Sequence, residues 1–259
     1  MRLFDKKKPA DLEQSFVQQR RLLLNENSNF YVQEAYKTLR TNLRFSLSHD
    51  GCKKLCLTSA LASEGKSTTV LNLAISFAMT GSRVLLIDGD MRRPSLSRLL
   101  IERAAPGLSN VLSGQSTIEE SIRRDIRPQL DVLFSGDIPP NPLELLGNTR
   151  MEQMMSWLTE HYDFILIDTP PVTIVSDACV IASLTDGVLF LVRQNETDKN
   201  TVIQGVKQLE LSNAKLLGFV MNGVTQGRGR GYKYKSKYGY RYKSRYAYES
   251  SDRRRTDKK

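Results

Sequence analysis

The chain has 259 residues, 40% hydrophobic and 25% charged, which suits a globular protein with one large α/β domain and short extensions. It holds no apolar run long enough to span a membrane, and its N-terminus lacks the apolar stretch of a signal peptide. Its three cysteines, an odd number without the spacing of zinc ligands, are typical of thiols in a reducing compartment. We therefore expect a cytoplasmic protein rather than a secreted, disulfide-rich one.

The net charge of +10 lies entirely at the C-terminal end. Residues 226–259 hold 13 lysines and arginines but only 3 acidic residues, whereas the preceding residues hold 25 of each sign. Strongly basic proteins often bind nucleic acid or anionic lipid. Here that argument applies to the C-terminal segment alone.

Short apolar runs alternate with helical patterns along the chain. Helices are predicted at 32–46, 67–79, 143–161 and 198–211, and nearly continuous apolar strands at 54–58, 83–87, 130–134, 164–167, 187–192 and 217–221. Alternating β and α elements predict an α/β fold with a doubly wound, mostly parallel sheet, which binds ligands at the carboxyl ends of its strands. We assign this domain to residues 51–225, between an extension at 1–50 and a disordered tail at 226–259.

The run LTSALASEGKSTTVLNLAISFA places Gly-Lys-Ser after a strand and at the start of a helix. This is the context in which backbone N–H groups and a helix N-terminus hold phosphates, as in the P-loop NTPases. Lys66 would reach the β- and γ-phosphates, and the Ser67 hydroxyl would bind Mg²⁺. Ala60 stands where the usual pattern begins with glycine, so the motif alone is weak. The residues expected to bind the phosphates of ATP are Ser63, Glu64, Gly65, Lys66, Ser67 and Thr68.

Acidic residues follow two further buried strands. DGDMRRP places Asp88 and Asp90 at a strand end, and FILIDTPP places Asp168 at another. Carboxylates in such positions suit a hydrated Mg²⁺ and the proton of a nucleophile, although the first two might instead cap a helix. Because all three motifs fall at strand carboxyl ends, we predict a nucleotide site there.

The tail reads GYKYKSKYGYRYKSRYAYE, and its tyrosines and basic residues alternate in position. An extended chain would show hydroxyls on one face and positive charge on the other. Three interpretations stay open: a solvated low-complexity tail, a single-stranded nucleic-acid binder, or a phosphate acceptor with several sites. The candidate acceptors are Tyr232, Tyr234, Tyr238, Tyr240, Tyr242, Tyr246 and Tyr248.

The sequence resembles the bacterial tyrosine kinases, P-loop enzymes of capsule and exopolysaccharide synthesis. The resemblance rests on DGDMRRP, EAYKTLRTNLRFS, SGDIPPNPLELL, IDTPPVTIVSDA and the terminal tyrosine cluster, and it covers nearly the whole chain. It implies ATP and Mg²⁺ as cofactors, with Lys66, Asp88 and Asp90 catalytic and with Ser67, Asp88 and Asp168 as metal ligands. Regulation of capsule or exopolysaccharide synthesis by autophosphorylation is the implied process.

Other residues take roles from the same resemblance. Asn222 in GFVMNGV resembles an adenine-reading asparagine, but an asparagine of a turn before glycine explains it equally well. Arg92 and Arg93 either steady the γ-phosphate or a phosphotyrosine, or simply begin a helix. Subunit contacts are implied for Glu34, Lys37 and Arg40, with lysine where the family has arginine.

The implied partners are further copies of this chain in a ring, such as an octamer, a transmembrane activator, a tyrosine phosphatase and protein substrates of polysaccharide synthesis. No nucleic-acid partner is implied, and the activator would hold the protein at the inner face of the membrane. The alternative is a P-loop ATPase of the partition or division-site type, whose tail binds nucleic acid or membrane. That class carries a lysine five places before the P-loop lysine, where this chain has Leu61.

Overall fold

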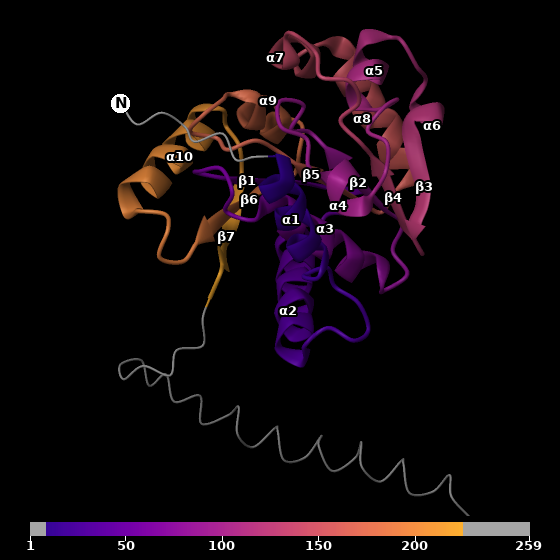
Figure 1. Cartoon of the computed structure of the whole chain (residues 1–259). Coiled ribbons are helices and arrows are strands. Elements are labelled where there is room, and N and C mark those ends of the chain that lie inside the picture. Colours follow the sequence, from indigo (N-terminus) through magenta and orange to yellow (C-terminus); the bar gives the residue numbers. More distant parts are fainter. Residues whose placement is uncertain (1–8, 225–259) are drawn as a thin grey trace, which may run out of the picture. The chain divides into compact units, whose positions relative to one another are not determined.

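A seven-stranded sheet forms the centre of the computed structural model, which describes residues 9–224 (Figure 1). The strand order is β3-β4-β2-β5-β1-β6-β7. The edge strand β3 pairs with β4 in the antiparallel sense, and all other neighbouring strands pair in parallel. The expectation of a mostly parallel sheet is confirmed. The strands are β1 (Lys53–Ser59), β2 (Val84–Asp88), β3 (Ile122–Arg127), β4 (Leu130–Leu133), β5 (Phe164–Asp168), β6 (Gly187–Arg193) and β7 (Leu216–Asn222).

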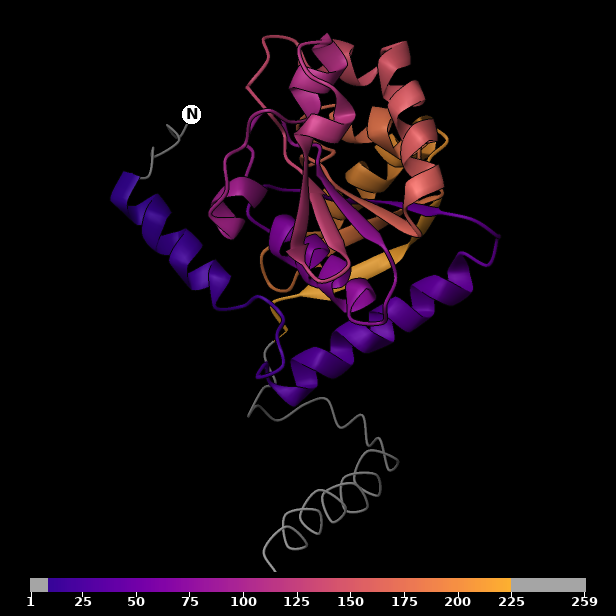
Figure 2. The same cartoon turned by 90° about the vertical axis from the view of Figure 1, so that its right-hand side faces the viewer.

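Helices cover both faces of the sheet, so that two apolar cores form (Figures 1 and 2). One core includes α2 (Phe30–Ser46), α3 (Lys66–Ala78) and α4 (Leu96–Leu100). Further helices pack on the opposite face, namely α5 (Leu108–Ser113), α7 (Pro142–Leu146), α8 (Thr149–His161), α9 (Asp177–Ser183) and α10 (Lys199–Leu211). Two elements complete the described chain, α1 (Pro9–Arg20), which contacts α4, and α6 (Ile118–Ser121), which precedes β3.

The central strands are covered on both sides. Every residue of β2 and β5 is buried, as the continuous runs of valine, leucine and isoleucine indicate. The edge strand β3 has the sequence IRRDIR, and it was not among the predicted strands because its charges break the apolar pattern.

The helix predicted at 143–161 is wrong as a single element. It is divided into α7 and α8 at Gly147 and Asn148. The Asn148 side chain accepts a hydrogen bond from the Met151 backbone N–H at 3.1 Å and so caps α8. Asparagine is among the preferred N-cap residues because its side chain satisfies a free N–H of the first turn.

The strands that carry the three sequence motifs are neighbours in the sheet. β2, β5 and β1 lie side by side and parallel, and their registers align Asp88 with Asp168 and Asp168 with Leu57. The loops that follow these strands therefore meet at one edge of the sheet. This convergence builds the candidate site.

Candidate nucleotide and phosphotransfer site

The loop between β1 and α3 has the backbone geometry of a phosphate cradle. Ser63 and Gly65 adopt positive φ angles of 65° and 96°, and α3 begins at Lys66. Residues in left-handed conformations before a helix turn successive N–H groups toward one point, which suits an anion. Ala60 is fully buried, and its carbonyl accepts a hydrogen bond from Thr173 at 2.5 Å. The residue that departs from the usual motif is thus buried inside the fold.

The side chain of Glu64 is turned into the protein. It is 2% exposed, and its carboxylate accepts hydrogen bonds from the Leu61 N–H at 2.8 Å and from the Thr197 hydroxyl. The Arg193 N–H reaches the same carboxylate at 3.4 Å. Buried carboxylates need such donors. The Glu64 side chain therefore braces the loop against the end of β6, and only its backbone is left to face a phosphate.

Asn222 lies beside the same loop. Its side-chain Nδ2 donates to the Glu64 carbonyl at 2.8 Å, and its Oδ1 accepts from the Gly223 N–H at 2.9 Å. A Cβ at Gly65 would approach Asn222 Nδ2 to 2.3 Å and would have to displace that side chain, and the φ of 96° itself favours glycine. Arg193, which sequence analysis missed, donates to the Ser63 carbonyl at 3.3 Å. β6 and β7 thus support the loop from the side.

Lys66 and Ser67 lie next to Asp168. The pKa of Lys66 is lowered by burial, and the charge of Asp168 is the main influence in the other direction. Burial raises the pKa of Asp168 to about 7, although Lys66 and a hydrogen bond with Ser67 oppose this rise. Lys66 is only 8% exposed, so its charge acts in a region of low dielectric, where it is strong.

Asp88 and Asp90 differ in their surroundings. Asp88 is fully buried, and burial followed by the charge of Asp168 holds its pKa well above the usual range. Asp90 is half-buried, and its Oδ1 accepts from the Arg93 N–H at 2.9 Å. Asp88 Oδ2 accepts from the Leu96 N–H at 3.2 Å. Asp88 thus binds the first N–H of α4, and Asp90 closes a turn before that helix, but one oxygen of Asp88 has no partner among the described residues.

Two carboxylate oxygens are left over. Asp88 Oδ1 and Asp168 Oδ1 are buried and have no hydrogen-bond partner among the described residues. Buried polar atoms without partners are rare in folded proteins, and the Asp168 carboxyl also forms a hydrogen bond with the Ser67 hydroxyl. Hard oxygen donors of this kind suit Mg²⁺, which usually takes only one or two carboxylates and completes its shell with water and phosphate. Within residues 9–224 no group of three or more His, Cys, Asp or Glu forms a ready-made metal cage.

Arg92 is held by Asp177 at the start of α9. Its Nε and Nη2 donate to the two oxygens of Asp177 at 2.7 and 3.0 Å, and the Asp177 side chain is fully buried. These bonds raise the pKa of Arg92. Two of its donors are therefore committed within the protein. Asp177 was not among the predicted site residues, although it lies within the IDTPPVTIVSDA motif.

The residues expected at a subunit interface lie on α2. Lys37 forms an ion pair with Glu34 at 2.8 Å on the surface of the helix. Arg40 instead donates to the carbonyl and hydroxyl of Ser76 on α3 of the same chain. The seven candidate acceptor tyrosines and the rest of the tail fall outside the described residues.

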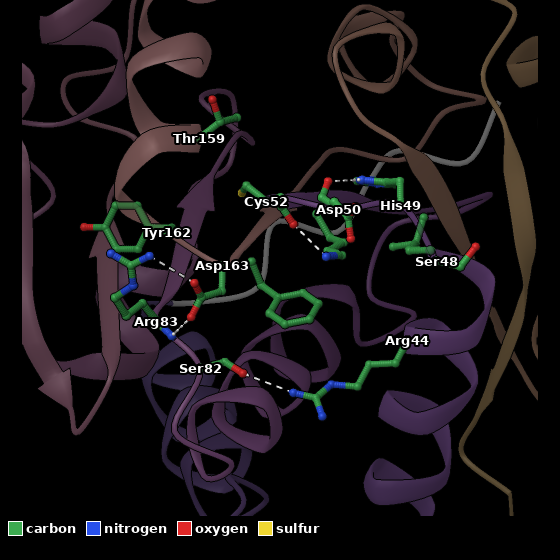
Figure 3. Close-up of a pocket in the computed structure, with 14 residues that line it drawn as sticks. Arg44, Ser48, His49, Asp50, Cys52, Ser82, Arg83, Thr159, Tyr162 and Asp163 are labelled. Carbon is green, nitrogen blue, oxygen red and sulfur yellow. Dashed lines mark hydrogen bonds and ion pairs between the residues drawn. The ribbon is translucent and has the colours of Figure 1, made fainter.

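A separate cavity lies away from these loops. A cavity of about 660 Å³ opens at the opposite edge of the sheet, between the end of α2 and the start of β5 (Figure 3). An Arg83–Asp163 ion pair lines it. The candidate site is thus recognised by its chemistry rather than by the size of a pocket. Among the helices of the described chain, none combines the length and apolar character that crossing a membrane requires.

Comparison with known proteins identifies relatives of the chain. Residues 52–216 match a family model described as an AAA domain. The tyrosine-protein kinase YwqD of Bacillus subtilis is 37% identical over 201 residues, which cover 78% of this chain and 85% of that protein.

Solved structures give the same result. The kinase domain of the Escherichia coli tyrosine kinase ETK is 32% identical with a TM-score of 0.74, over 78% of this chain and 80% of that chain. The chimerical protein CapA2B2 is 32% identical with a TM-score of 0.73, over 83% and 98% of the two chains. These relatives favour the kinase over the partition-type ATPase. The chain belongs to the bacterial tyrosine-protein kinases, which have a P-loop nucleotide-binding fold.

Proposed function

We propose that the chain transfers the γ-phosphate of ATP to tyrosines of its own C-terminal segment. The observation that carries this proposal is the meeting of three segments at one sheet edge. Lys66 and Ser67 begin α3 after the P-loop, Asp88 and Asp90 stand at and after the end of β2, and Asp168 ends β5. The segment 226–259 supplies seven tyrosines as acceptors.

The buried side chains of the site are assigned to phosphate binding and metal binding. Lys66 holds the β- and γ-phosphates by its charge, and the α3 N-terminus binds their oxygens through backbone N–H groups. Asp88, Asp168 and the Ser67 hydroxyl would hold Mg²⁺, which neutralises charge that develops on the phosphates. Asp88 is fully buried, so it faces the metal rather than the acceptor.

Asp90 is left as the proton acceptor. It is the one acid of the three that reaches solvent, and a tyrosine hydroxyl, with an ordinary pKa of about 10, must lose its proton as the new P–O bond forms. The bond between the γ-phosphorus and the bridging oxygen of ADP breaks in the same step. Positioning and charge stabilisation therefore account for the chemistry, and no covalent enzyme intermediate is needed.

We propose that the tail enters the site of a neighbouring copy in a ring of subunits. The test mixes a Lys66→Met chain with an active chain that ends at residue 225. Phosphotyrosine on the Lys66→Met tail supports transfer between copies. An unmodified tail in the mixture, with full labelling of the wild-type tail alone, would refute it.

Phosphorylation would then cancel or reverse the charge of the tail. Each phosphate adds roughly −1.5 to −2 charges, so seven add about −10 to −14 against a net +10. We propose that this change weakens contacts with acidic partners and anionic lipid and dissociates the ring. An assembly mass that stays the same after full phosphorylation, at low and at physiological salt, would contradict the dissociation.

The relatives also suggest the cellular process in which the kinase acts. We propose control of capsule or exopolysaccharide synthesis, with a transmembrane activator that brings the chain to the membrane and a phosphatase that resets the tail. Phosphotyrosine measured in cells with and without a candidate activator tests this setting. An identical signal in both would remove the activator from the scheme.

A further inference from the structure

Helix α9 contacts the loop that carries the proposed proton acceptor. Asp177, its first residue, binds Arg92 through both carboxylate oxygens, and Arg92 is two residues after Asp90. A bidentate pair fixes direction as well as distance, because the guanidinium plane and the carboxylate plane must align. The pair joins segments that are 85 residues apart in the chain.

The same helix touches the loop at a second point. Gly89 approaches so closely that an added Cβ would meet Ile181 Cδ1 of α9 at 2.8 Å and the Asp168 carbonyl at 2.7 Å. The Gly89 N–H also donates to that carbonyl at 2.8 Å. Met91, between Asp90 and Arg92, is fully buried in the core that includes Ile181. The loop is thus fixed on both sides of Asp90.

The loop needs such support because the acidic groups at this edge of the sheet repel one another. Asp88, Asp90 and Asp168 gather at one edge, and the charges of the other two acids help to hold the pKa of Asp88 above its usual range. The charge of Asp90 attracts the Arg92 guanidinium and, after the hydrogen bonds to Asp177, helps to raise the pKa of Arg92. The cation is kept in place by a carboxylate that is fully buried.

We propose that Asp177 is a positioning residue, which acts through Arg92 to hold Asp90 in line with the acceptor hydroxyl. The inference rests on the proposed role of Asp90. It distinguishes Arg92 from Arg93, because two N–H groups of the Arg92 guanidinium already bind Asp177 and only the remaining ones could bind a phosphate. A simpler view is that Asp177 merely favours the N-terminus of α9, where an acidic residue is stabilising.

The chain contains a matched control. Arg83 and Asp163 form a similar pair at the opposite sheet edge, where Arg83 donates from Nη2 at 3.0 Å and from its backbone N–H at 2.8 Å (Figure 3). An Asp163→Asn substitution makes the same chemical change as Asp177→Asn, far from the nucleotide loops. It should leave transfer unchanged.

The experiment measures tail phosphorylation by full-length wild type, Asp177→Asn, Arg92→Lys and Asp163→Asn, with thermal unfolding and Mg·ATP binding on each. We expect kcat to fall at least about tenfold in Asp177→Asn and Arg92→Lys, because small displacements of a reacting group cost up to ~10²-fold. ATP affinity should stay within about threefold, since the P-loop is untouched. The Asp177→Asn/Arg92→Lys double variant should be no slower than the slower single one.

The outcomes separate the possibilities. Equal kcat in wild type and Arg92→Lys, which keeps a charge at the site and is the less disruptive change, would overturn the inference. Parallel loss of ATP binding and kcat in both variants would also overturn it and favour a general structural role. A wild-type chain that leaves no phosphotyrosine on its tail would instead reject the proposed function itself.

Discussion

Asp88 and Asp168 lie opposite each other in the register of β2 and β5, and each keeps one buried carboxylate oxygen without a partner among the described residues. Two buried carboxylates on paired strands resist ionisation together, and the charge of Asp168 accordingly helps to hold the pKa of Asp88 above its usual range. The enzyme thus carries an electrostatic cost at the place where we propose that a cation binds.

This cost makes stability depend on pH. The pKa of Asp168 is raised to about 7 from an ordinary value of 3.8, so the folded chain binds a proton that the unfolded chain releases. The stabilising effect of this proton is fully present below pH 4 and is lost as the pH rises through about 7. We predict that Asp168→Asn raises the melting temperature at pH 8 but changes it little at pH 4.5, without metal. A larger gain at pH 4.5 would contradict the assignment.

Bound Mg²⁺ should offset the loss of stability that the ionised Asp168 causes at pH 8. We expect Mg·ADP to raise the melting temperature of the wild type at pH 8, because a ligand that binds only the folded chain stabilises it. Asp168→Asn should gain clearly less. Differential scanning fluorimetry across a Mg²⁺ series checks this, and Asp163→Asn, at the other sheet edge, should respond like the wild type.

Loss of the P-loop cation should abolish transfer while the fold survives. Lys66 is buried next to Asp168, and methionine keeps an unbranched side chain, one atom shorter, without the charge. We expect Lys66→Met to lower phosphorylation of the tail by at least ~10³-fold, since a group that neutralises transition-state charge is removed. Lys207→Met on the exposed side of α10 is the control. Phosphopeptide mapping of both variants provides the measurement.

Gly65 should tolerate no side chain. Gly65→Ala has to adopt a φ of 96° and must displace Asn222, whereas Gly81→Ala meets the same kind of angle, 81°, in open space. The angle alone costs about 1–2 kcal/mol. We predict that both variants lose this stability in urea unfolding but that only Gly65→Ala loses nucleotide binding. Normal ATP affinity in Gly65→Ala would show that the Asn222 contact does not matter.

Asn222 should act on nucleotides of either base. Its Nδ2 supports the Glu64 carbonyl, so Asn222→Ala loosens the loop that holds the phosphates. We expect ATP and GTP affinities to fall together, by roughly tenfold for the loss of one hydrogen bond of about 1 kcal/mol and the loop order it maintains. Binding measured by calorimetry decides the matter. If only the affinity for ATP fell, the result would instead support a role of Asn222 in recognising adenine.

Arg40 should stabilise the single chain, whatever it does between chains. It donates to Ser76 on α3, and we predict that Arg40→Ala lowers the free energy of unfolding by about 1–2 kcal/mol. Lys37→Ala removes an exposed ion pair with Glu34 and should cost less than ~0.5 kcal/mol. Urea unfolding and sedimentation of both variants separate stability from assembly. Equal stabilities would contradict the packing on α3.

The sheet and its motifs were predictable because their signal is local. Apolar runs that end in Asp88 or Asp168, and a Gly65-Lys66-Ser67 turn before a helix, indicate strand ends whatever the rest of the chain does. Glu64 and Asn222 were among the predicted site residues, and both lie at the P-loop. The partners of their side chains could not be predicted, because a sequence does not show which way a side chain points.

The contacts between distant segments were not predictable. Asp177 is an acid at the start of a short helix, and nothing in its own neighbourhood indicates Arg92 as its partner. Arg193 and Thr197 support the P-loop from the end of β6, and only the sheet order places them there. The α7–α8 division was visible in retrospect, since Gly147 and Asn148 are typical of a helix end followed by a new N-cap.

The position of Asn222 also limits how far the acceptors can travel. Its side chain is fixed to the P-loop, and the proposed acceptors follow it by 10 residues (Tyr232) to 26 residues (Tyr248), no more than about 35 to 90 Å along an extended chain. Tyrosines tethered by a short flexible segment are presented at an effective concentration of up to about the millimolar range, without any need for a tight docking site. Such a kinase can use acceptors of poor intrinsic affinity. Selectivity would then come from which copy stands within reach rather than from the sequence around each tyrosine.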